Sequence, residues 1–166
     1  MAKADRRETR ESDILSGELR AAFGRHCREA RIKRGLSQQE VAAVSGMGQA
    51  IIAKTERGQK NITLETMMRI LRVVDRAFAR RLKGDLKARF GTNVRTARTE
   101  AGLSQAQLAE RAGVRRAYIS RIETGNGNVK LETVATISRA VGQDPNQLLG
   151  GVFDTRSTSG DPSVGA

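Results

Sequence analysis

Residue types that carry covalent or metal chemistry are scarce in this sequence of 166 amino acids. Its one histidine and one cysteine are neighbours, His26 and Cys27. Adjacent residues of a helix face different sides, so these two cannot hold one metal ion together. The sequence also has no Gly-rich phosphate loop and no nucleophile with a histidine base to activate it. We therefore expect no enzyme activity, no metal and no cofactor, and we interpret Cys27 as a small core residue.

The residue types that are abundant in this sequence are the positively charged ones. Lysine and arginine number 30 against 18 aspartates and glutamates, which gives a formal net charge of +12, and the sequence pI is near 11.1. This balance favours a polyanionic partner, although by itself it reports only non-specific attraction. No apolar run approaches the ~18 residues of a membrane span, and the start of the chain lacks the apolar segment of a signal peptide. A single cysteine excludes an internal disulfide framework, so we expect a soluble, cytoplasmic protein without a membrane partner.

The elements that position these charges form a repeat. The stretch that begins at Phe23 aligns without a gap with the stretch that begins at Phe90, so equivalent positions differ in number by a constant 67 (90 minus 23). The motif GLSQ occurs at 35–38 and again at 102–105, and so long a match indicates two copies of one small domain. The predicted organisation is a disordered tail (1–13), a first domain (14–75), a basic helical linker (76–89), a second domain (90–150) and a disordered tail (151–166).

Each copy has the signals of several short helices. Apolar residues recur at intervals of three and four, and Ser37 and Ser104 each begin a capping box that starts a second helix. A short helix, a turn and another short helix then make a helix-turn-helix, in which Gly46 and Gly113 supply a positive φ at the turn. No segment alternates with the period of two that is typical of a strand, so the predicted fold class is all-α.

The predicted linker, residues 76–89, carries six basic side chains and one acidic side chain. Phe78, Leu82, Leu86 and Phe90 fall at intervals of four, which predicts a helix with an apolar stripe, bent at Gly84. Two interpretations of its basic face stay open. It is either a strut that crosses a phosphate backbone or a solvated helix packed on one of the domains.

The two helix-turn-helix segments resemble a known family, the Cro/cI-type (XRE) helix-turn-helix DNA-binding proteins of bacteria and phages. The likeness covers roughly residues 14–75 and 86–149. It rests on GLSQ, Ala42, Gly46, Ile52, Glu56 and Gly58 and on their partners in the second copy. The first copy, LSQQEVAAVSGMGQAIIAKTERG, is especially similar to the phage lambda repressor motif. The resemblance implies two lambda-repressor-like five-helix domains in tandem, each with a third helix that enters the major groove of DNA.

The resemblance also implies which side chains read bases, at the start of the second helix and on the exposed side of the third. They are Gln38, Gln49, Ala50 and Lys54 in the first copy and Gln105, Arg116, Ala117 and Arg121 in the second. Glutamine suits adenine, arginine suits guanine, and the alanine methyl group can meet that of thymine. Gln49 and Arg116 share one repeat position, so we expect the copies to prefer different bases. The competing interpretation of each residue is a solvated helix face.

Other positions are expected to contact the DNA backbone or to hold the domain together. The candidate phosphate contacts are Ser37, Lys60, Asn61, Ser104, Arg115, Asn126, Asn128 and Lys130. Arg115 occupies an N-cap position where Ser or Thr would cap better, which favours a ligand-facing role. The resemblance further implies two structural ion pairs, Arg31 with Glu56 and Arg98 with Glu123.

Together these expectations describe a sequence-specific, double-stranded DNA-binding transcriptional regulator of the cytoplasm and nucleoid, a repressor rather than an activator. The linker spans about 21 Å as a helix and at most about 46 Å when extended, and half-sites on one face of a duplex lie about 34 Å apart. One chain can therefore reach two adjacent major grooves. A homodimer stays open, and no small-molecule ligand is expected.

Two alternatives remain. In one, the first copy is a protein-interaction module, as in an antitoxin or an anti-activator, and dimerises or binds a protein partner. Its third helix, QAIIAKTE, is less basic than RRAYISRIE and has Ile51 where the second copy has Tyr118. In the other, the chain binds the nucleoid non-specifically through its charge, with a steep salt dependence and no operator preference.

Overall fold

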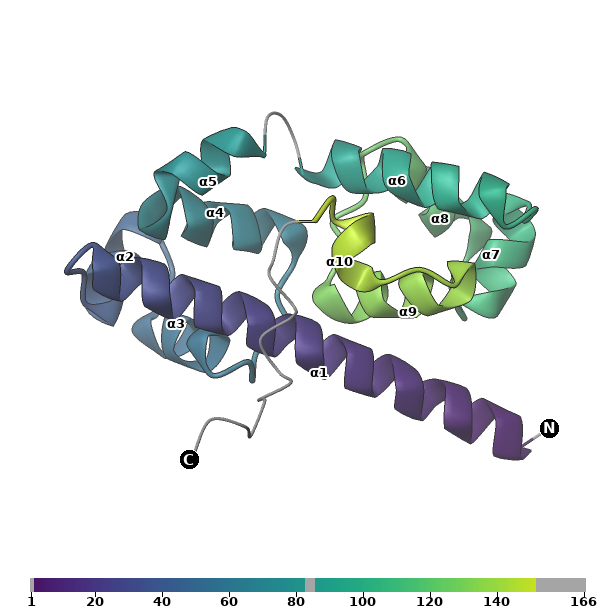
Figure 1. Cartoon of the computed structure of the whole chain (residues 1–166), viewed down its shortest axis with the longest axis horizontal. Helices are drawn as coiled ribbons and strands as arrows, with labels where there is room; N and C mark the ends of the chain where they lie inside the picture. Colours follow the sequence, from purple (N-terminus) through teal and green to yellow (C-terminus); the bar gives the residue numbers. More distant parts are fainter. Residues whose placement is uncertain (1, 83–85, 152–166) are drawn as a thin grey trace, which may run out of the picture.

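A computed structural model of the chain describes residues 2–82 and 86–151, with side chains from residue 10 onward. Over these residues the chain consists of helices joined by turns, without a strand, so the predicted all-α fold is confirmed (Figure 1). The helices are α1 (Ala2–Lys33), α2 (Gln38–Ser45), α3 (Gln49–Glu56), α4 (Leu64–Val74), α5 (Arg76–Arg81), α6 (Leu86–Glu100), α7 (Gln105–Arg111), α8 (Arg116–Glu123), α9 (Leu131–Val141) and α10 (Pro145–Leu148).

The two copies fold as two five-helix domains, α1 to α5 and α6 to α10. Phe23 and Phe90, at one repeat position, are both completely buried. Equivalent aliphatic residues are buried in both domains as well, among them Ile52 with Ile119 and Leu64 with Leu131. The spacing that predicted the core residues therefore builds the same small apolar core twice.

A glycine next to each buried phenylalanine allows the first helix of a domain to approach the third. A Cβ atom on Gly24 would lie 2.5 Å from the carbonyl oxygen of Thr55, and one on Gly91 would lie 2.1 Å from that of Ile122. Both distances are far below a carbon–oxygen contact, and the obstacle is backbone. Glycine is therefore required at both positions to seat α3 on α1 and α8 on α6.

The helix-turn-helix signals are confirmed in both copies. Ser37 accepts a hydrogen bond from the Glu40 amide, while the Glu40 carboxylate accepts one from the Ser37 amide. Ser104 and Gln107 form the same reciprocal pair. Gly46 has φ 65° and Gly113 has φ 63°, the left-handed region that a residue with a side chain adopts only at a cost.

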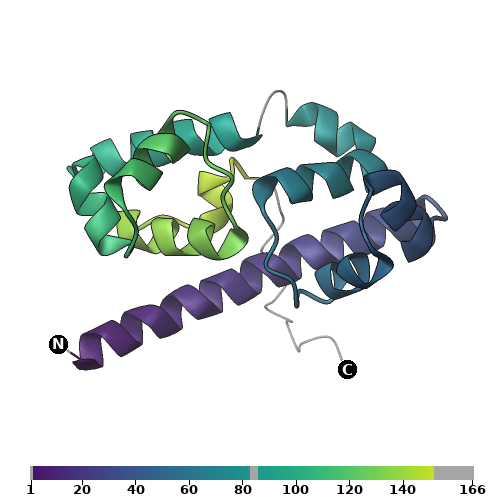
Figure 2. The same ribbon diagram turned by 180° about the vertical axis from the view of Figure 1, so that it is seen from behind.

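The two domains meet through backbone hydrogen bonds between repeat-equivalent loops. The Leu64 amide donates to the Val129 carbonyl at 2.8 Å, and the Leu131 amide donates to the Ile62 carbonyl at 3.0 Å. Leu64 and Leu131 share one repeat position, as do Ile62 and Val129. Each loop therefore donates one hydrogen bond and accepts one at equivalent positions. This reciprocity is typical of a two-fold axis, and the single chain therefore has the arrangement of a dimer of its own two halves (Figures 1 and 2).

The prediction of a disordered tail at 1–13 is wrong for the described residues, because α1 is helical from Ala2. Its N-terminal half crosses the second domain and lies along α9. Ser12 and Ser16 are buried there, and the hydroxyl groups of Ser12 and Thr136 are 2.9 Å apart. The pattern was missed because the stripe that contacts α9 consists of small polar residues instead of aliphatic ones.

The predicted linker 76–89 is also divided differently. Residues 76–81 form α5, the fifth helix of the first domain, which Asp75 caps by accepting a hydrogen bond from the Phe78 amide. Residues 86–89 are the first turn of α6. The predicted bend at Gly84 and the predicted tail at 152–166 lie outside the described residues. By repeat position α5 and α6 correspond to residues 9–33 of α1 (76 minus 67, 100 minus 67), and Figure 1 shows α1 along one long edge and α5 with α6 along the other.

Candidate nucleic-acid interface

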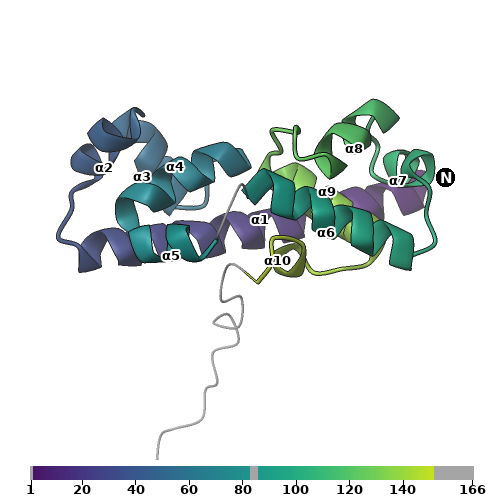
Figure 3. The same ribbon diagram turned by 90° about the horizontal axis from the view of Figure 1, so that it is seen from above.

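Helices α3 and α8 lie on the same side of the molecule. Both face the viewer in Figure 2, and Figure 3 shows them on the side opposite α10. Each is anchored by a buried isoleucine at one repeat position, Ile52 in α3 and Ile119 in α8. The residues predicted to read bases from these helices are all exposed: Gln49, Ala50, Lys54, Arg116, Ala117 and Arg121. Two helices of this kind on one face can enter successive grooves of one duplex.

The N-termini of α3 and α8 have no side-chain cap. Gly48 and Arg115 occupy the N-cap positions, and neither accepts a capping hydrogen bond. The Ile51 and Tyr118 amides donate to the carbonyls of Gly48 and Arg115. The two amides that precede each of them, with the positive end of the helix dipole, form the usual setting for a phosphate contact. Arg115 itself is exposed, so the structure leaves the phosphate role predicted for it sterically possible.

Helices α2 and α7 differ from each other at their N-termini, in the side chain that binds the N-cap amide. The amide of Ser37 is occupied by the Glu40 carboxylate at 2.7 Å, whereas that of Ser104 is occupied by the neutral amide oxygen of Gln107 at 2.8 Å. The hydrogen bonds from Ser37 lower the pKa of Glu40. The first copy therefore presents a negative charge beside the predicted phosphate contact, and the second copy does not. The predictions for Ser37 and Ser104 treat the two positions alike and do not include this difference.

Two predicted base readers, Gln38 and Gln105, are tied into the interior. The Gln38 amide nitrogen donates to Glu56 Oε2 at 2.8 Å, and that of Gln105 donates to Glu123 Oε2 at 2.9 Å. Each side-chain amide keeps its second N–H as a donor, so the two-bond contact with adenine stays a prediction for both residues. Their amide oxygens remain as acceptors.

The two ion pairs implied by the resemblance are present in nearly identical geometry. Arg31 Nε lies 2.6 Å from Glu56 Oε1, and Arg98 Nε lies 2.6 Å from Glu123 Oε1. Second bonds from Nη2 make both pairs bidentate, and the glutamate side chains are only 5% and 4% exposed.

Each arginine also donates from Nη1 to the leucine carbonyl of GLSQ, at Leu36 and Leu103 respectively. The pair thus fixes the first helix, the end of the third helix and the start of the second. Burial raises the pKa of Glu56, but hydrogen bonds from Arg31 and Gln38 outweigh it, so the pKa lies below the ordinary value. The same balance lowers the pKa of Glu123.

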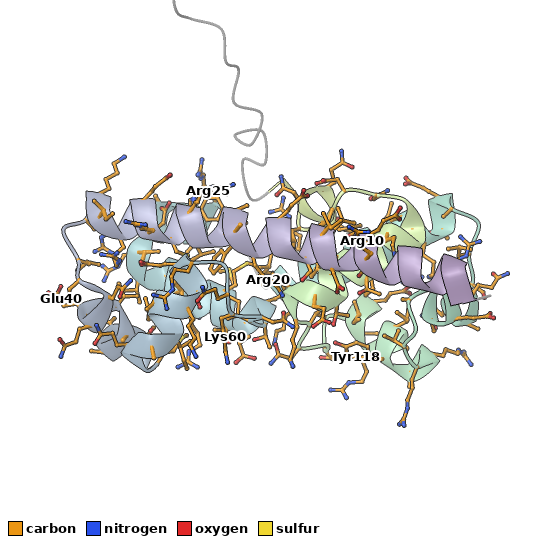
Figure 4. All side chains as sticks on the ribbon, turned by 90° about the horizontal axis from the view of Figure 1, so that it is seen from below. Arg10, Arg20, Arg25, Glu40, Lys60 and Tyr118 are labelled. Atoms are coloured by element: carbon orange, nitrogen blue, oxygen red, sulfur yellow. The ribbon has the colours of Figure 1, made fainter. Side chains whose placement is uncertain are left out.

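The loop residues predicted to hold phosphates separate into two groups. Lys60, Asn126, Asn128 and Lys130 are exposed, and Figure 4 shows Lys60 and Tyr118 along the same margin of the molecule. Asn61 is instead part of the junction between the domains. Its Nδ2 donates to Glu132 Oε2 at 2.7 Å, and its Oδ1 accepts from the Glu132 amide at 3.2 Å. Asn61 therefore contributes to the contact between the two domains in this structure. In the sequence, the one signal for this role was that Asn61 lies in a loop with a repeat equivalent, at Asn128, in the other copy.

The one cysteine and the one histidine both lie in the interior or at its margin, next to other side chains of the first domain. Cys27 is buried, as predicted, and burial raises the pKa of its thiol. His26 Nε2 lies 3.4 Å from Asp75 Oδ2, beside the ring of Phe78. Within residues 2–82 and 86–151, His, Cys, Asp and Glu side chains form no group of three placed to bind a metal. Over the same part of the chain, no helix combines the length and apolarity needed to cross a membrane.

Comparison with known proteins gives a consistent result. Residues 28–79 and 94–148 each match the family described as helix-turn-helix. The control protein C.BamHI of Bacillus amyloliquefaciens is 38% identical over 69 residues, which are 41% of this chain and 85% of that protein. The control protein C.SmaI of Serratia marcescens is 38% identical over 65 residues, 39% of this chain and 77% of that protein.

Among solved structures, the restriction-modification controller protein C.AhdI of Aeromonas hydrophila is 38% identical. The match covers 39% of this chain and 96% of that one, with a TM-score of 0.37. The two control proteins C.BamHI and C.SmaI are thus each matched over most of their own length by a segment the size of one copy.

Proposed function

This chain belongs to the helix-turn-helix family of the XRE type, and on that premise we propose that it is a sequence-specific, double-stranded DNA-binding transcriptional regulator that docks both of its motifs on one face of the duplex. The observation that carries the proposal is the reciprocal hydrogen bonding between residues 62–64 and 129–131. It relates the domains by a local two-fold axis with α3 and α8 on one side. One chain then does what two copies of a single-domain regulator do as a dimer.

The operator that fits this arrangement has two unlike half-sites. The first copy offers Gln49 and Lys54 from α3, and the second offers Arg116 and Arg121 from α8. Glutamine pairs best with adenine and arginine with guanine, so the second half-site is the one richer in guanine. Occupying an operator that overlaps a promoter represses transcription, and repression is the regulatory sign we propose.

Selection of bound sites from random DNA, followed by footprinting, tests this function. We expect protection of two half-sites with centres about 10 base pairs apart. Gln49→Ala with Lys54→Ala should remove protection from one half-site, and Arg116→Ala with Arg121→Ala from the other. Arg10→Ala with Arg25→Ala is the control, because these exposed arginines lie on α1, away from α3 and α8 (Figure 4). Equal binding to selected and scrambled duplex would leave only charge-driven association and refute the proposal.

A second candidate function, a protein-interaction surface on the first copy, is favoured by one observation. The first copy exposes Val44 at 70% and Ile32 at 58%. The equivalent residues of the second copy are Arg111 and Thr99. Exposed aliphatic residues that gather in one patch are typical of a partner-binding surface, so this function requires Val44 and Ile32 to contact the same partner. If Gln49→Ala with Lys54→Ala leaves both half-sites protected, the first copy does not read DNA and this second function is the better account.

A further inference from the structure

A groove of about 1100 Å³ opens on the edge of the molecule formed by α4, α5 and α6. We call it the arginine groove, after the cations that line it: Arg69, Arg72, Arg76, Arg80 and Lys87. Glu65 is the one carboxylate among the described residues of the lining. Figure 3 looks onto this edge and shows α3 and α8 on a different side. The groove therefore remains accessible while α3 and α8 face DNA.

The opposite edge carries only part of this charge, since Arg72 and Lys87 have Arg139 and Arg20 as repeat equivalents while other cations of the groove have none. There α1 covers α9, the repeat equivalent of α4, and Ser12 contacts Thr136. The position equivalent to Thr136 is Arg69 (136 minus 67), and the position equivalent to Asp13 is Arg80 (13 plus 67). A neutral residue and an acidic residue on the closed edge are thus both arginine on the open edge.

Internal pairing does not account for these arginines. Arg69 Nη2 donates to the Ser45 carbonyl at 2.6 Å, which holds this one side chain against the end of α2. Arg72, Arg76 and Arg80 are exposed, and within the described part of the chain no carboxylate forms an ion pair with them. Neighbouring like charges repel one another and lower stability. Their placement together in one groove favours a ligand that brings the negative charge.

Phosphate groups match this lining best. The planar guanidinium fork binds phosphate oxygens through two charge-assisted hydrogen bonds, and small-molecule sites commonly measure about 300–1,000 Å³, close to the size of this groove. The lining arginines come from two helices, α4 and α5, which favours a chain of phosphate groups over a single phosphate. We propose that the arginine groove binds a small molecule with a chain of phosphate groups, either a nucleoside polyphosphate or an inorganic oligophosphate, held by Arg72, Arg76 and Arg80.

The position of the groove links this ligand to DNA binding, a step that rests on the proposed function. Helices α4 and α5 belong to the first domain and α6 to the second, so a phosphate chain that reaches from Arg72 to Lys87 bridges the domains. The groove borders the backbone junction at 62–64 and 129–131, because Leu64 belongs to both. The bridge fixes the relative setting of α3 and α8, and such preorganisation raises the affinity for a two-half-site operator.

Calorimetric titration of the full chain tests the site without DNA, at about 0.15 M salt so that exposed charges are screened beyond ~8 Å. We expect saturable one-to-one binding of sodium tripolyphosphate and of ATP, and none of citrate. Equal affinities for the first two indicate recognition of the phosphate chain alone, and tighter ATP binding indicates a nucleoside polyphosphate. Arg72→Gln with Arg80→Gln should weaken binding roughly tenfold for each charge-assisted hydrogen bond that the substitutions remove.

Two variants of equal charge separate this site from general attraction of anions. Arg10→Gln with Arg25→Gln removes two charges from α1, and Arg116→Gln with Arg121→Gln removes two from α8; both should leave tripolyphosphate binding unchanged. Equal weakening in all three variants, absence of saturation, or equal binding of citrate overturns the proposal. A selected operator bound no more tightly with tripolyphosphate present overturns the regulatory step alone. Failure to select any operator refutes the proposed function and leaves the calorimetric result standing.

Discussion

Helix α8 begins with Arg116, behind an N-cap that is itself Arg115, and has Arg121 on its exposed side. Helix α3 begins with Gln49 behind a glycine and has Lys54 at the matching position. Beneath these surfaces the two copies have the same internal ion pair, and the distance between arginine Nε and glutamate Oε1 is 2.6 Å in both. Interior positions are constrained by packing in both copies, and the exposed positions of α3 and α8 are not. Their divergence is the basis for the prediction that the two copies prefer different bases.

The largest effect is expected where the copies agree, at the ion pairs. Arg31→Ala or Arg98→Ala leaves a nearly buried glutamate without its partner, which should lower the free energy of unfolding by about 3–5 kcal/mol. Urea denaturation followed by circular dichroism measures the change. Arg10→Ala, which removes an exposed arginine of α1, should stay within about 0.5 kcal/mol. Similar small losses for Arg31→Ala and Arg98→Ala would show that the pairs do not support the fold.

The same pairs predict how stability depends on pH. The pKa values of Glu56 and Glu123 lie below the ordinary value of 4.5 in the folded chain. Their contribution is therefore complete above that value and is lost as the pH falls through the lower folded-state values. Urea midpoints measured from neutral to acidic pH should decline in this acidic range. The double variant Glu56→Gln with Glu123→Gln should be less stable at neutral pH and show a shallower acid decline; an unchanged slope would assign the acid sensitivity to other carboxyl groups.

Making the two copies alike should change the selected DNA. Gln49→Arg with Lys54→Arg gives α3 the two arginines of α8, so both half-sites should take the sequence preferred by the second copy. Each two-bond contact with a base supplies about 1–3 kcal/mol of discrimination. Repeating the selection with this variant measures the change directly. An operator that stays asymmetric would mean that residues outside these positions set the first half-site.

The close approach of the first and third helices gives a smaller, graded effect. Gly91→Ala places a Cβ 2.1 Å from a carbonyl oxygen, against 2.5 Å for Gly24→Ala. Both should destabilise by about 1–3 kcal/mol, the first more than the second, in thermal unfolding. Gly17→Ala is the control, because its Cβ would meet nothing closer than an Arg20 nitrogen at 4.0 Å, and alanine favours the helix. Equal losses at all three positions would point to general helix effects.

The sequence predicted the elements whose signals are local. The internal repeat, the capping boxes and the turn glycines together predicted the helices and the helix-turn-helix geometry. The resemblance added the two ion pairs. The contact between the two domains was not predicted. The stripe of Ser12 and Ser16 that seats α1 on α9 has no apolar periodicity, and the pairing of 62–64 with 129–131 uses backbone groups that no side-chain pattern marks.

The sequence predicted the positions of the candidate interface residues. It did not predict which of their side chains also bond to other residues of the chain. Gln38 and Gln105 occupy the places expected of base readers, and one amide N–H of each also binds Glu56 or Glu123, which the sequence did not indicate. Asn61 sits in the expected loop, yet it bonds to Glu132. No small-molecule ligand was predicted, although three cations of the arginine groove, Arg76, Arg80 and Lys87, lie in the basic segment 76–89. The cations of the groove come from three helices, and only the fold brings them to one edge.

The smallest effect is expected at the capping boxes, where the copies differ by a single charge. Glu40→Gln gives α2 the neutral cap that Gln107 gives α7, retains the hydrogen bond to Ser37, and removes a negative charge from the side of the predicted phosphate contact. Operator affinity should rise roughly two- to fivefold, as for other charges near a helix N-terminus. Gln107→Glu is the reciprocal variant and should lower affinity by a similar factor, with both effects reduced at higher salt. If neither variant changes the binding isotherm, the N-termini of α2 and α7 do not approach the DNA backbone, and the phosphate contacts must come from α3, α8 and the loops.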